Sequence, residues 1–267
     1  MGLDIKSLKS RIKSVDSTLH LTKAMGLVAS AKIRGATIAM NKSRQYSKAL
    51  ADTVSLLASS KICEKSEYMQ SSENGKVCII VVAGDRGLAG GYNSNIFKLT
   101  DSLGDSKIIP IGKRACDRFG KEQIKVEAYS YEDAIILANR LCGEFKEGKY
   151  EKIGIVSTKY VSMMTQNPEV EWVLPVTKTE KSTKADIIYE PDERTVLEAV
   201  IGEYIAGKIV AAARESFACE VVARRFAMDS AGKNAGEMID SLKLQYNRAR
   251  QGAITQEITE IVAGSGM

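Results

Sequence analysis

The residues best placed for chemistry form a glycine-rich segment directly after an apolar run. Gly84–Asn93 (GDRGLAGGYN) follows Val77–Ala83, a run rich in β-branched residues that is typical of a buried strand. Nucleotide phosphates often bind at a glycine-rich turn after such a strand. The glycines are spaced wrongly for the dinucleotide motif, however, and the chain contains no G-x-x-x-x-G-K-[ST]. The segment therefore predicts a tight turn rather than a nucleotide site.

The other reactive side chains do not form a recognisable catalytic set. His20 is the only histidine, so no Ser/His/Asp or Cys/His arrangement is expected, and on its predicted helix it should lie in solvent or at a rim. The five cysteines are scattered without a C-x-x-C pair: Cys63, Cys78, Cys116, Cys142 and Cys219. We expect reduced, mostly buried thiols, with no metal, no cofactor and no catalysis by this chain alone.

Positive charge is concentrated at the start of the chain. Residues 1–61 hold eleven Lys and Arg against three Asp, a balance of +8, whereas the whole chain carries +5, so the remainder carries −3. Such a segment indicates an acidic partner. The alternative is a basic coiled-coil nucleic-acid-binding or scaffold protein, although no interleaved aromatic residues, RNA-binding signature or zinc finger accompany the charge.

Composition predicts an ordered chain of one or two domains, with 44% hydrophobic and 27% charged residues. The longest apolar run, Val77–Ala83, is too short to cross a bilayer. No signal or transit peptide is expected before the first helix, because helical spacing begins at once. Any membrane association is therefore expected to be indirect.

The middle of the chain alternates between strand and helix patterns. Strands are expected at Val77–Ala83, Lys107–Ile111, Ile153–Thr158 and, as an edge strand between two prolines, Val170–Val176. Helices are expected at Asn95–Leu103 and Tyr131–Phe145. This alternation predicts a Rossmann-like α/β domain. Polar segments at Glu64–Lys76 and Lys178–Asp186 resemble exposed linkers into and out of it.

The N-terminal segment has an apolar or small residue at every third or fourth position over seven repeats. A helix across it would be on the order of 80 Å long and would need a partner along its length. The seam positions are Ile5, Leu8, Ile12, Val15, Leu19, Thr22, Gly26, Ala29, Ile33, Ala36, Met40, Ser43, Ser47, Leu50, Val54 and Leu57.

The natural partner of this seam lies at the other end of the chain. From about Val196 to Val262 there is no proline, and a similar spacing recurs at Met228, Ala231, Ala235, Met238 and Leu242. The ends therefore predict an antiparallel coiled coil; a parallel homodimeric coil is the alternative. We place the N-terminal helix at 1–61, the α/β domain at 62–195 and the C-terminal helix at 196–267.

An apolar stripe continues almost to the C-terminus. Ile254, Ile258, Ile261 and Val262 have helical spacing, and only five residues follow them. Chain ends are usually polar, so something is expected to cover this stripe. Either the last helix docks on the core of the same chain, or another molecule supplies the cover.

Four motifs give the chain a resemblance to the gamma subunit of F-type ATP synthase, the central shaft of a rotary motor. Residues 21–32 resemble I-T-K-A-M-x-M-V-A-x-x-K, and residues 85–93 resemble D-R-G-L-C-G-G-x-N. Tyr189–Pro191 matches a short motif near the end of the foot domain. Residues 220–228 and 246–262 resemble the C-terminal signature, E-x-A-A-R-x-x-A-M and Y-N-x-x-R-Q-A-x-I-T-x-E-I-x-E-I-V. Gly26 departs from the larger or charged residue usual in the family, as Ala89 does from its frequent cysteine.

The resemblance implies a rotor that transmits torque and catalyses nothing itself. Its implied partners are the hexamer of alpha and beta subunits, the epsilon subunit and the c-ring, at the cytoplasmic face of the cell membrane. It further implies three groups of contact residues. They are Met25, Arg86, Arg224, Arg250 and Gln251 toward the beta subunit; Ile254, Ile258, Ile261 and Val262 in an apolar bearing; and Tyr189 and Glu190 toward the c-ring and epsilon.

Overall fold

The computed structural model describes residues 5–72, 75–120, 124–177 and 188–265. The predicted linker at Lys178–Asp186 lies outside them. The chain divides into two compact units, residues 1–30 with 224–267, and residues 31–223. Two long helices, α1 (Ile5–Ala58) and α5 (Glu193–Gly264), contribute to both units. Each unit is described in turn.

A four-stranded sheet forms the centre of the unit 31–223. Its strands are β1 (Lys76–Val82), β2 (Lys107–Ile111), β3 (Tyr150–Tyr160) and β4 (Gln166–Leu174), in the order β2-β1-β3-β4. The first three are parallel, and β4 pairs antiparallel with β3 at the edge. Pro168 lies within β4, where an edge strand tolerates the missing donor. The predicted α/β fold is confirmed, including the edge strand.

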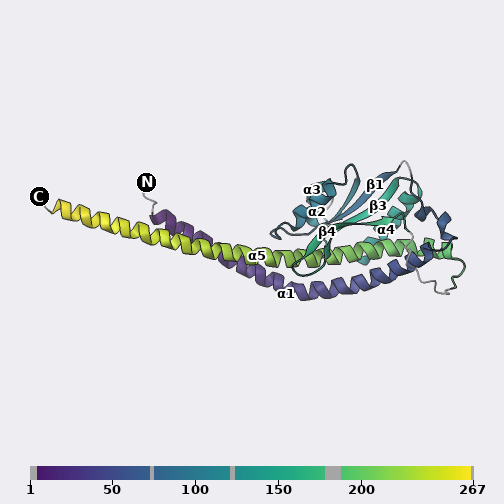
Figure 1. The fold of residues 1–267 in the computed structure, drawn as a ribbon, viewed down its shortest axis with the longest axis horizontal. Helices are drawn as coiled ribbons and strands as arrows, with labels where there is room; N and C mark the ends of the chain where they lie inside the picture. Colours follow the sequence, from purple (N-terminus) through teal and green to yellow (C-terminus); the bar gives the residue numbers. More distant parts are fainter. Residues whose placement is uncertain (1–4, 73–74, 121–123, 178–187, 266–267) are drawn as a thin grey trace. The chain divides into compact units, whose positions relative to one another are not determined.

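The two faces of the sheet carry separate cores, with α4 on one face and α2 and α3 on the other. On one face, alternate residues of β1 and β3 pack with α4 (Tyr131–Lys146) and α5. On the other, Ile79, Val81 and Val156 pack with α2 (Tyr92–Asp101) and α3 (Lys113–Phe119). Period-two alternation lets one strand serve both cores. Figure 1 shows the sheet with helices on its two sides.

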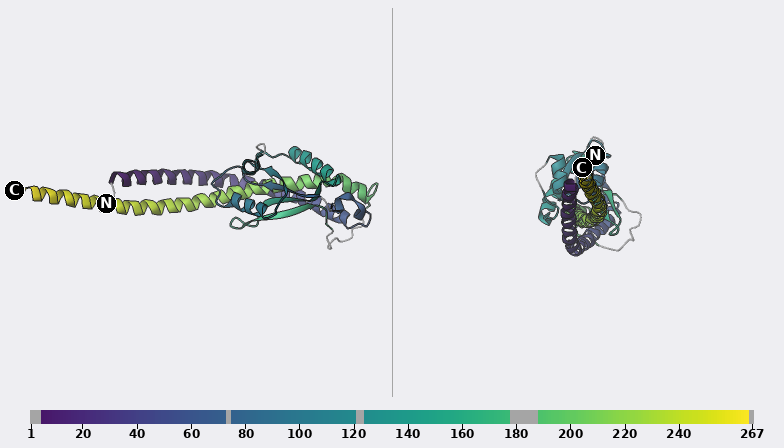
Figure 2. Two further views of the ribbon diagram at one scale, coloured as in Figure 1. Left: turned by 90° about the horizontal axis from the view of Figure 1, so that it is seen from above. Right: turned by 90° about the vertical axis from the view of Figure 1, so that its left-hand side faces the viewer.

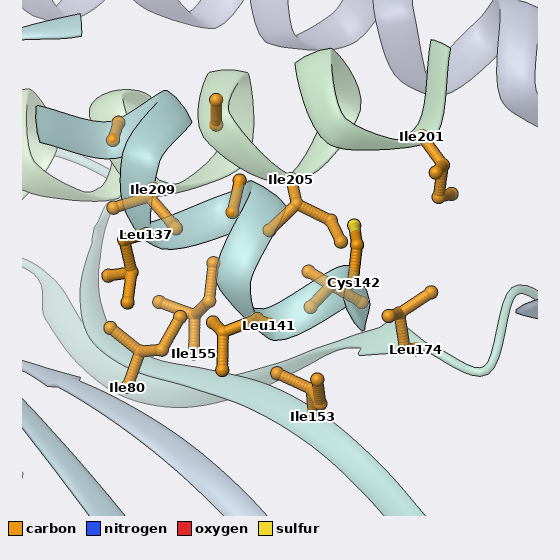
Figure 3. Close-up of a cluster of buried hydrophobic side chains, with 14 of the residues drawn as sticks. Ile80, Leu137, Leu141, Cys142, Ile153, Ile155, Leu174, Ile201, Ile205 and Ile209 are labelled. Carbon is orange, nitrogen blue, oxygen red and sulfur yellow. The ribbon is translucent and has the colours of Figure 1, made fainter. Parts of the chain in front are cut away.

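The larger core combines branched aliphatic side chains from three layers. Figure 3 shows Ile80, Ile153 and Ile155 from the sheet meeting Leu137 and Leu141 of α4 and the isoleucines of α5. Ser130 starts α4 by accepting from the Asp133 backbone N–H at 3.1 Å, and the Asp133 carboxylate accepts from the Ser130 N–H at the same distance. The capped helix is thus fixed over the sheet.

The prediction of an exposed linker at Glu64–Lys76 is partly wrong. It holds two short 3₁₀ turns, η1 (Cys63–Lys65) and η2 (Glu67–Met69), and joins the larger core. Ser66 is fully buried and Tyr68 is 4% exposed. The Tyr68 ring stacks on Phe145 with centroids 6.5 Å apart. Tyr68 therefore packs into the core from a segment that is otherwise largely polar.

Within the unit 31–223, α1 and α5 run antiparallel. A Cβ added to Gly207 would lie 2.9 Å from Leu50, whereas Arg44 forms an ion pair with Glu215. As residue numbers rise along α1, the residue numbers of its contacts on α5 therefore fall. This intrachain pairing confirms the antiparallel coil and contradicts the parallel homodimeric alternative.

The other unit is also an antiparallel helix pair, formed by the first part of α1 and the last part of α5 (Figure 2). A Cβ on Gly26 would lie 3.1 Å from the Arg225 guanidinium and 3.6 Å from Met228 Cβ, and one on Gly232 would lie 3.7 Å from Thr22. The small seam residues therefore allow close approach of the helices. Gly26, unusual for the family, lies at such a contact.

The predicted seam of α1 is confirmed at every position, since none of its sixteen residues is exposed. The predicted seam of α5 is wrong at one position. Met238 is 48% exposed, and Ile239 is buried instead. Buried seam positions along a coiled-coil helix lie three or four residues apart, and here the buried position after Ala235 lies four residues further on. Leu242 is again buried, so the error is local.

Candidate functional site

The glycine-rich segment forms a tight connection between β1 and α2. Leu88 and Gly90 adopt left-handed backbone conformations, with φ of 60° and 58°. The Gly84 N–H donates to Asn93 Oδ1 at 2.9 Å, which joins the two ends of the segment. This geometry confirms the tight turn predicted from the sequence.

Asp85 ties this turn to two other segments of the same unit. Its carboxylate accepts from the backbone N–H groups of Lys113 at 3.1 Å, Val126 at 2.9 Å and Glu127 at 3.0 Å. Lys113 is the first residue of α3. A single carboxylate therefore positions the start of α3 and the segment before α4.

Glu220 of α5 holds the same turn from the opposite side. The side chain of Glu220 is nearly buried, at 1% exposure, and accepts from the Asp85 and Arg86 N–H groups at 3.0 Å each. Backbone N–H groups that would face a phosphate in a nucleotide-binding turn here face a carboxylate of the same chain. The turn is therefore an anion-holding structure that already contains its anion.

A second contact joins α2 to α5 nearby. The Tyr92 hydroxyl contacts the Ser216 hydroxyl at 2.6 Å and donates to the Ser216 carbonyl at 3.0 Å. Burial raises the pKa of Tyr92, so this hydroxyl stays protonated. Sequence reasoning placed Glu220 and Asp85 in separate motifs and missed their contact, because no spacing rule links residues 135 positions apart.

The predicted contact residues differ in how much surface they offer. Arg86 is exposed on the turn of the unit 31–223. Met25 and Arg224 belong to the other unit; Met25 is half-buried, and Arg224 is only 8% exposed, which leaves little of it for a partner. Tyr189 packs partly against the larger core, whereas Glu190 is exposed.

The end of α5 carries the largest uncovered apolar stripe among the predicted sites. Ile254, Ile258, Ile261 and Val262 are 47%, 56%, 69% and 64% exposed. Figure 1 shows this part of α5 extending past the start of α1. Arg250 and Gln251, at the base of the stripe, are exposed as well. Within its own unit, the stripe is therefore left uncovered by the described residues.

The thiols are inert. All five cysteines are buried and unpaired, as predicted. Burial raises the pKa of Cys78 and Cys219 to about 12, so neither is a thiolate at neutral pH. Within the described parts of the chain, no three His, Cys, Asp or Glu side chains gather as a metal site would require. His20 is exposed on α1, 3.8 Å from Asp16.

No helix in the described residues has the length and apolar character needed to span a membrane.

Solved structures share the fold. The rotor of the Euglena gracilis mitochondrial ATP synthase aligns with a TM-score of 0.68 at 17% identity, covering 94% of this chain and 98% of that chain. The central stalk and c-ring structure from Tetrahymena thermophila gives 0.62 at 19% identity, covering 79% and 99%.

Sequence comparison is more specific. A family model described as ATP synthase matches residues 4–266. An ATP synthase gamma chain of Ruminococcus albus is 39% identical over 98% of both chains. Those of Moorella thermoacetica and Geotalea uraniireducens are 37% and 36% identical over 98% of this chain and 98% and 97% of theirs. These matches favour the rotor over a nucleic-acid-binding or scaffold protein. The chain belongs to the family of ATP synthase gamma chains.

Proposed function

We propose that this chain is the central rotor subunit of an F-type ATP synthase. It transmits torque between a membrane c-ring and a hexamer of alpha and beta subunits, and so couples ion translocation to ATP synthesis or hydrolysis. It contributes no catalytic residues of its own. The observation that carries the proposal, beyond the family, is the uncovered apolar end of α5.

The apolar end would turn in an apolar collar formed by the hexamer. Four large side chains, each about half or more exposed, line it: Ile254, Ile258, Ile261 and Val262. Fully burying one such side chain stabilises by about 1.5–3 kcal/mol. An apolar bearing adds no directional bonds, so it holds the shaft without fixing its rotation angle.

Polar contacts with the beta subunits would form only at particular rotation angles of the shaft. Arg250 and Gln251 are exposed at the base of the stripe and can bind a beta-subunit loop transiently. An arginine stays charged at working pH and offers several donors to a carboxylate. Arg86 and the basic α1 provide further charge toward acidic loops of the beta subunits. Met25 and Arg224 would contribute through the part of each that is exposed.

The α/β domain would form the foot at residues 62–195. Tyr189 and Glu190 are its contacts with the epsilon subunit and the c-ring, and they lie close to the start of α5. The chain would reach the membrane only through the c-ring, as a peripheral protein at the cytoplasmic face of the cell membrane. No nucleic acid partner is involved.

A single substitution in the stripe tests the bearing. Ile258→Asp should leave the unfolding temperature of the isolated chain unchanged, because Ile258 is 56% exposed, yet should lower ATP hydrolysis by the assembled complex several-fold. Thr259→Asp is the control, since it adds the same charge at a neighbouring exposed polar position. Equal activity of the two assembled variants would refute the bearing.

A further inference from the structure

A polar cleft lies within the unit 31–223, away from the glycine-rich turn. It is about 300 Å³ in volume and is lined by residues of α1, α5, β3 and β4. Four cationic side chains line it: Arg44, Lys48, Lys159 and Lys208. Only two carboxylates accompany them, those of Glu171 and Glu215. The lining therefore carries a charge of +2 when all six groups are ionised.

The carboxylates are already bonded within the chain. Glu215 is 2% exposed, pairs with Arg44 and accepts from the Tyr160 N–H at 2.7 Å. Glu171 accepts from Lys208 and from Lys159, the latter at 3.5 Å. Burial alone would raise the pKa of Glu171, but the two lysines outweigh it and hold that pKa below its ordinary value. Both carboxylates are thus already bonded within the chain, and the net charge of the cleft lining is positive.

Three groups at the cleft keep their donors available. Lys48 is exposed and has no ion pair with any residue that the structure describes. Ser47 and Ser157 are 6% and 7% exposed, and their hydroxyls form no hydrogen bond within the described ranges. One ammonium group and two hydroxyls, none of them bonded to an acceptor in the described residues, thus line one small cleft of net positive charge.

We propose that this cleft binds a small tetrahedral oxyanion, of which inorganic phosphate is the simplest. Such an ion accepts several hydrogen bonds at once, and its charge matches the surplus of the lining. Lys48 and the two serine hydroxyls supply the donors, and the net positive charge of the whole lining attracts the ion. The near burial of both serines favours a free ion over an acidic side chain carried on a partner's surface.

The test uses the full chain in a chloride buffer of constant ionic strength. Isothermal titration with inorganic phosphate should give a dissociation constant of about 1–10 mM. Lys48→Gln should weaken binding at least threefold, and Ser157→Ala should weaken it as well. The matched control is Lys42→Gln, which removes the same charge from an exposed position of the same helix outside the cleft. It should bind as the native chain does.

Two results would overturn the proposal. The first is the absence of phosphate binding by the native chain at concentrations well above this range. The second is an equal loss for Lys42→Gln and Lys48→Gln, which would assign the effect to the general charge of α1. Titration with AMP separates a free ion from the phosphate of a larger molecule: tighter binding of AMP, with the same dependence on Lys48, would contradict a small-ion site.

Discussion

Removing the Glu220 carboxylate should loosen the glycine-rich turn without unfolding the chain. In Glu220→Gln the side chain keeps its size, but one of the two acceptor oxygens becomes an NH₂ group. That group would face a backbone N–H, so either the Asp85 or the Arg86 hydrogen bond is lost. The substitution thereby changes the charge and the hydrogen bonding of this side chain but not its size.

The expected magnitude follows from the bonds and their surroundings. A hydrogen bond to a charged group contributes about 1.5–3 kcal/mol. One is lost and the other becomes neutral, but Asp85 and Arg86 are not fully buried, so water can partly replace the acceptor. We expect Glu220→Gln to cost about 2–3 kcal/mol. Gly84→Ala should act on the same contact, since its Cβ would lie 2.7 Å from Glu220 Cδ.

Hydrogen exchange of individual amides is the direct assay. The Asp85 and Arg86 amides should lose protection in Glu220→Gln, while amides in the centre of β1 keep theirs. Glu237→Gln is the control, because Glu237 is an exposed glutamate of the same helix. Unchanged protection at Asp85 and Arg86 would refute the role assigned to Glu220.

Three further predictions concern the coil, the cleft and the shaft end. Ala29→Leu should destabilise the chain by about 1–3 kcal/mol in thermal unfolding, because Ala29 is 3% exposed, whereas Ala24→Leu on the exposed side should not; equal effects would mean the seam is misplaced. The pKa of Glu171 is lowered on folding, so its contribution to stability is full above its unfolded pKa of about 4.3 and is lost as pH falls through the lower folded value. Urea titrations should show that Glu171→Gln removes this part of the acid sensitivity, and an unchanged pH profile would contradict it. Arg250→Ala combined with Gln251→Ala should assemble normally but reduce turnover of the complex, and full turnover would exclude the proposed contact.

The coil and the sheet could be predicted because each has a repeating pattern. Sixteen seam positions of α1 followed from spacing alone, and the strands followed from β-branched runs. The short helix α3 was missed, since two turns carry too little periodicity to recognise. Met238 was misplaced because steps of three and four are equally allowed in a helix.

The site was less predictable than the fold. The contact of Glu220 with the glycine-rich turn depends on how α5 lies against the sheet, and tertiary packing of this kind leaves no local signal. The apolar end of α5 was visible as a stripe, but spacing could not decide whether the chain itself covers it. The structure shows that the other residues of its own unit do not cover it.

Rotation of this chain inside the hexamer tests the central claim most directly. The alpha/beta hexamer would be immobilised and a visible reporter attached to the foot through Ser102→Cys, an exposed position; the five native cysteines are buried and should not react. During ATP hydrolysis the reporter should turn continuously in one direction. A complex that hydrolyses ATP at the normal rate while the reporter stays still would contradict a rotor function.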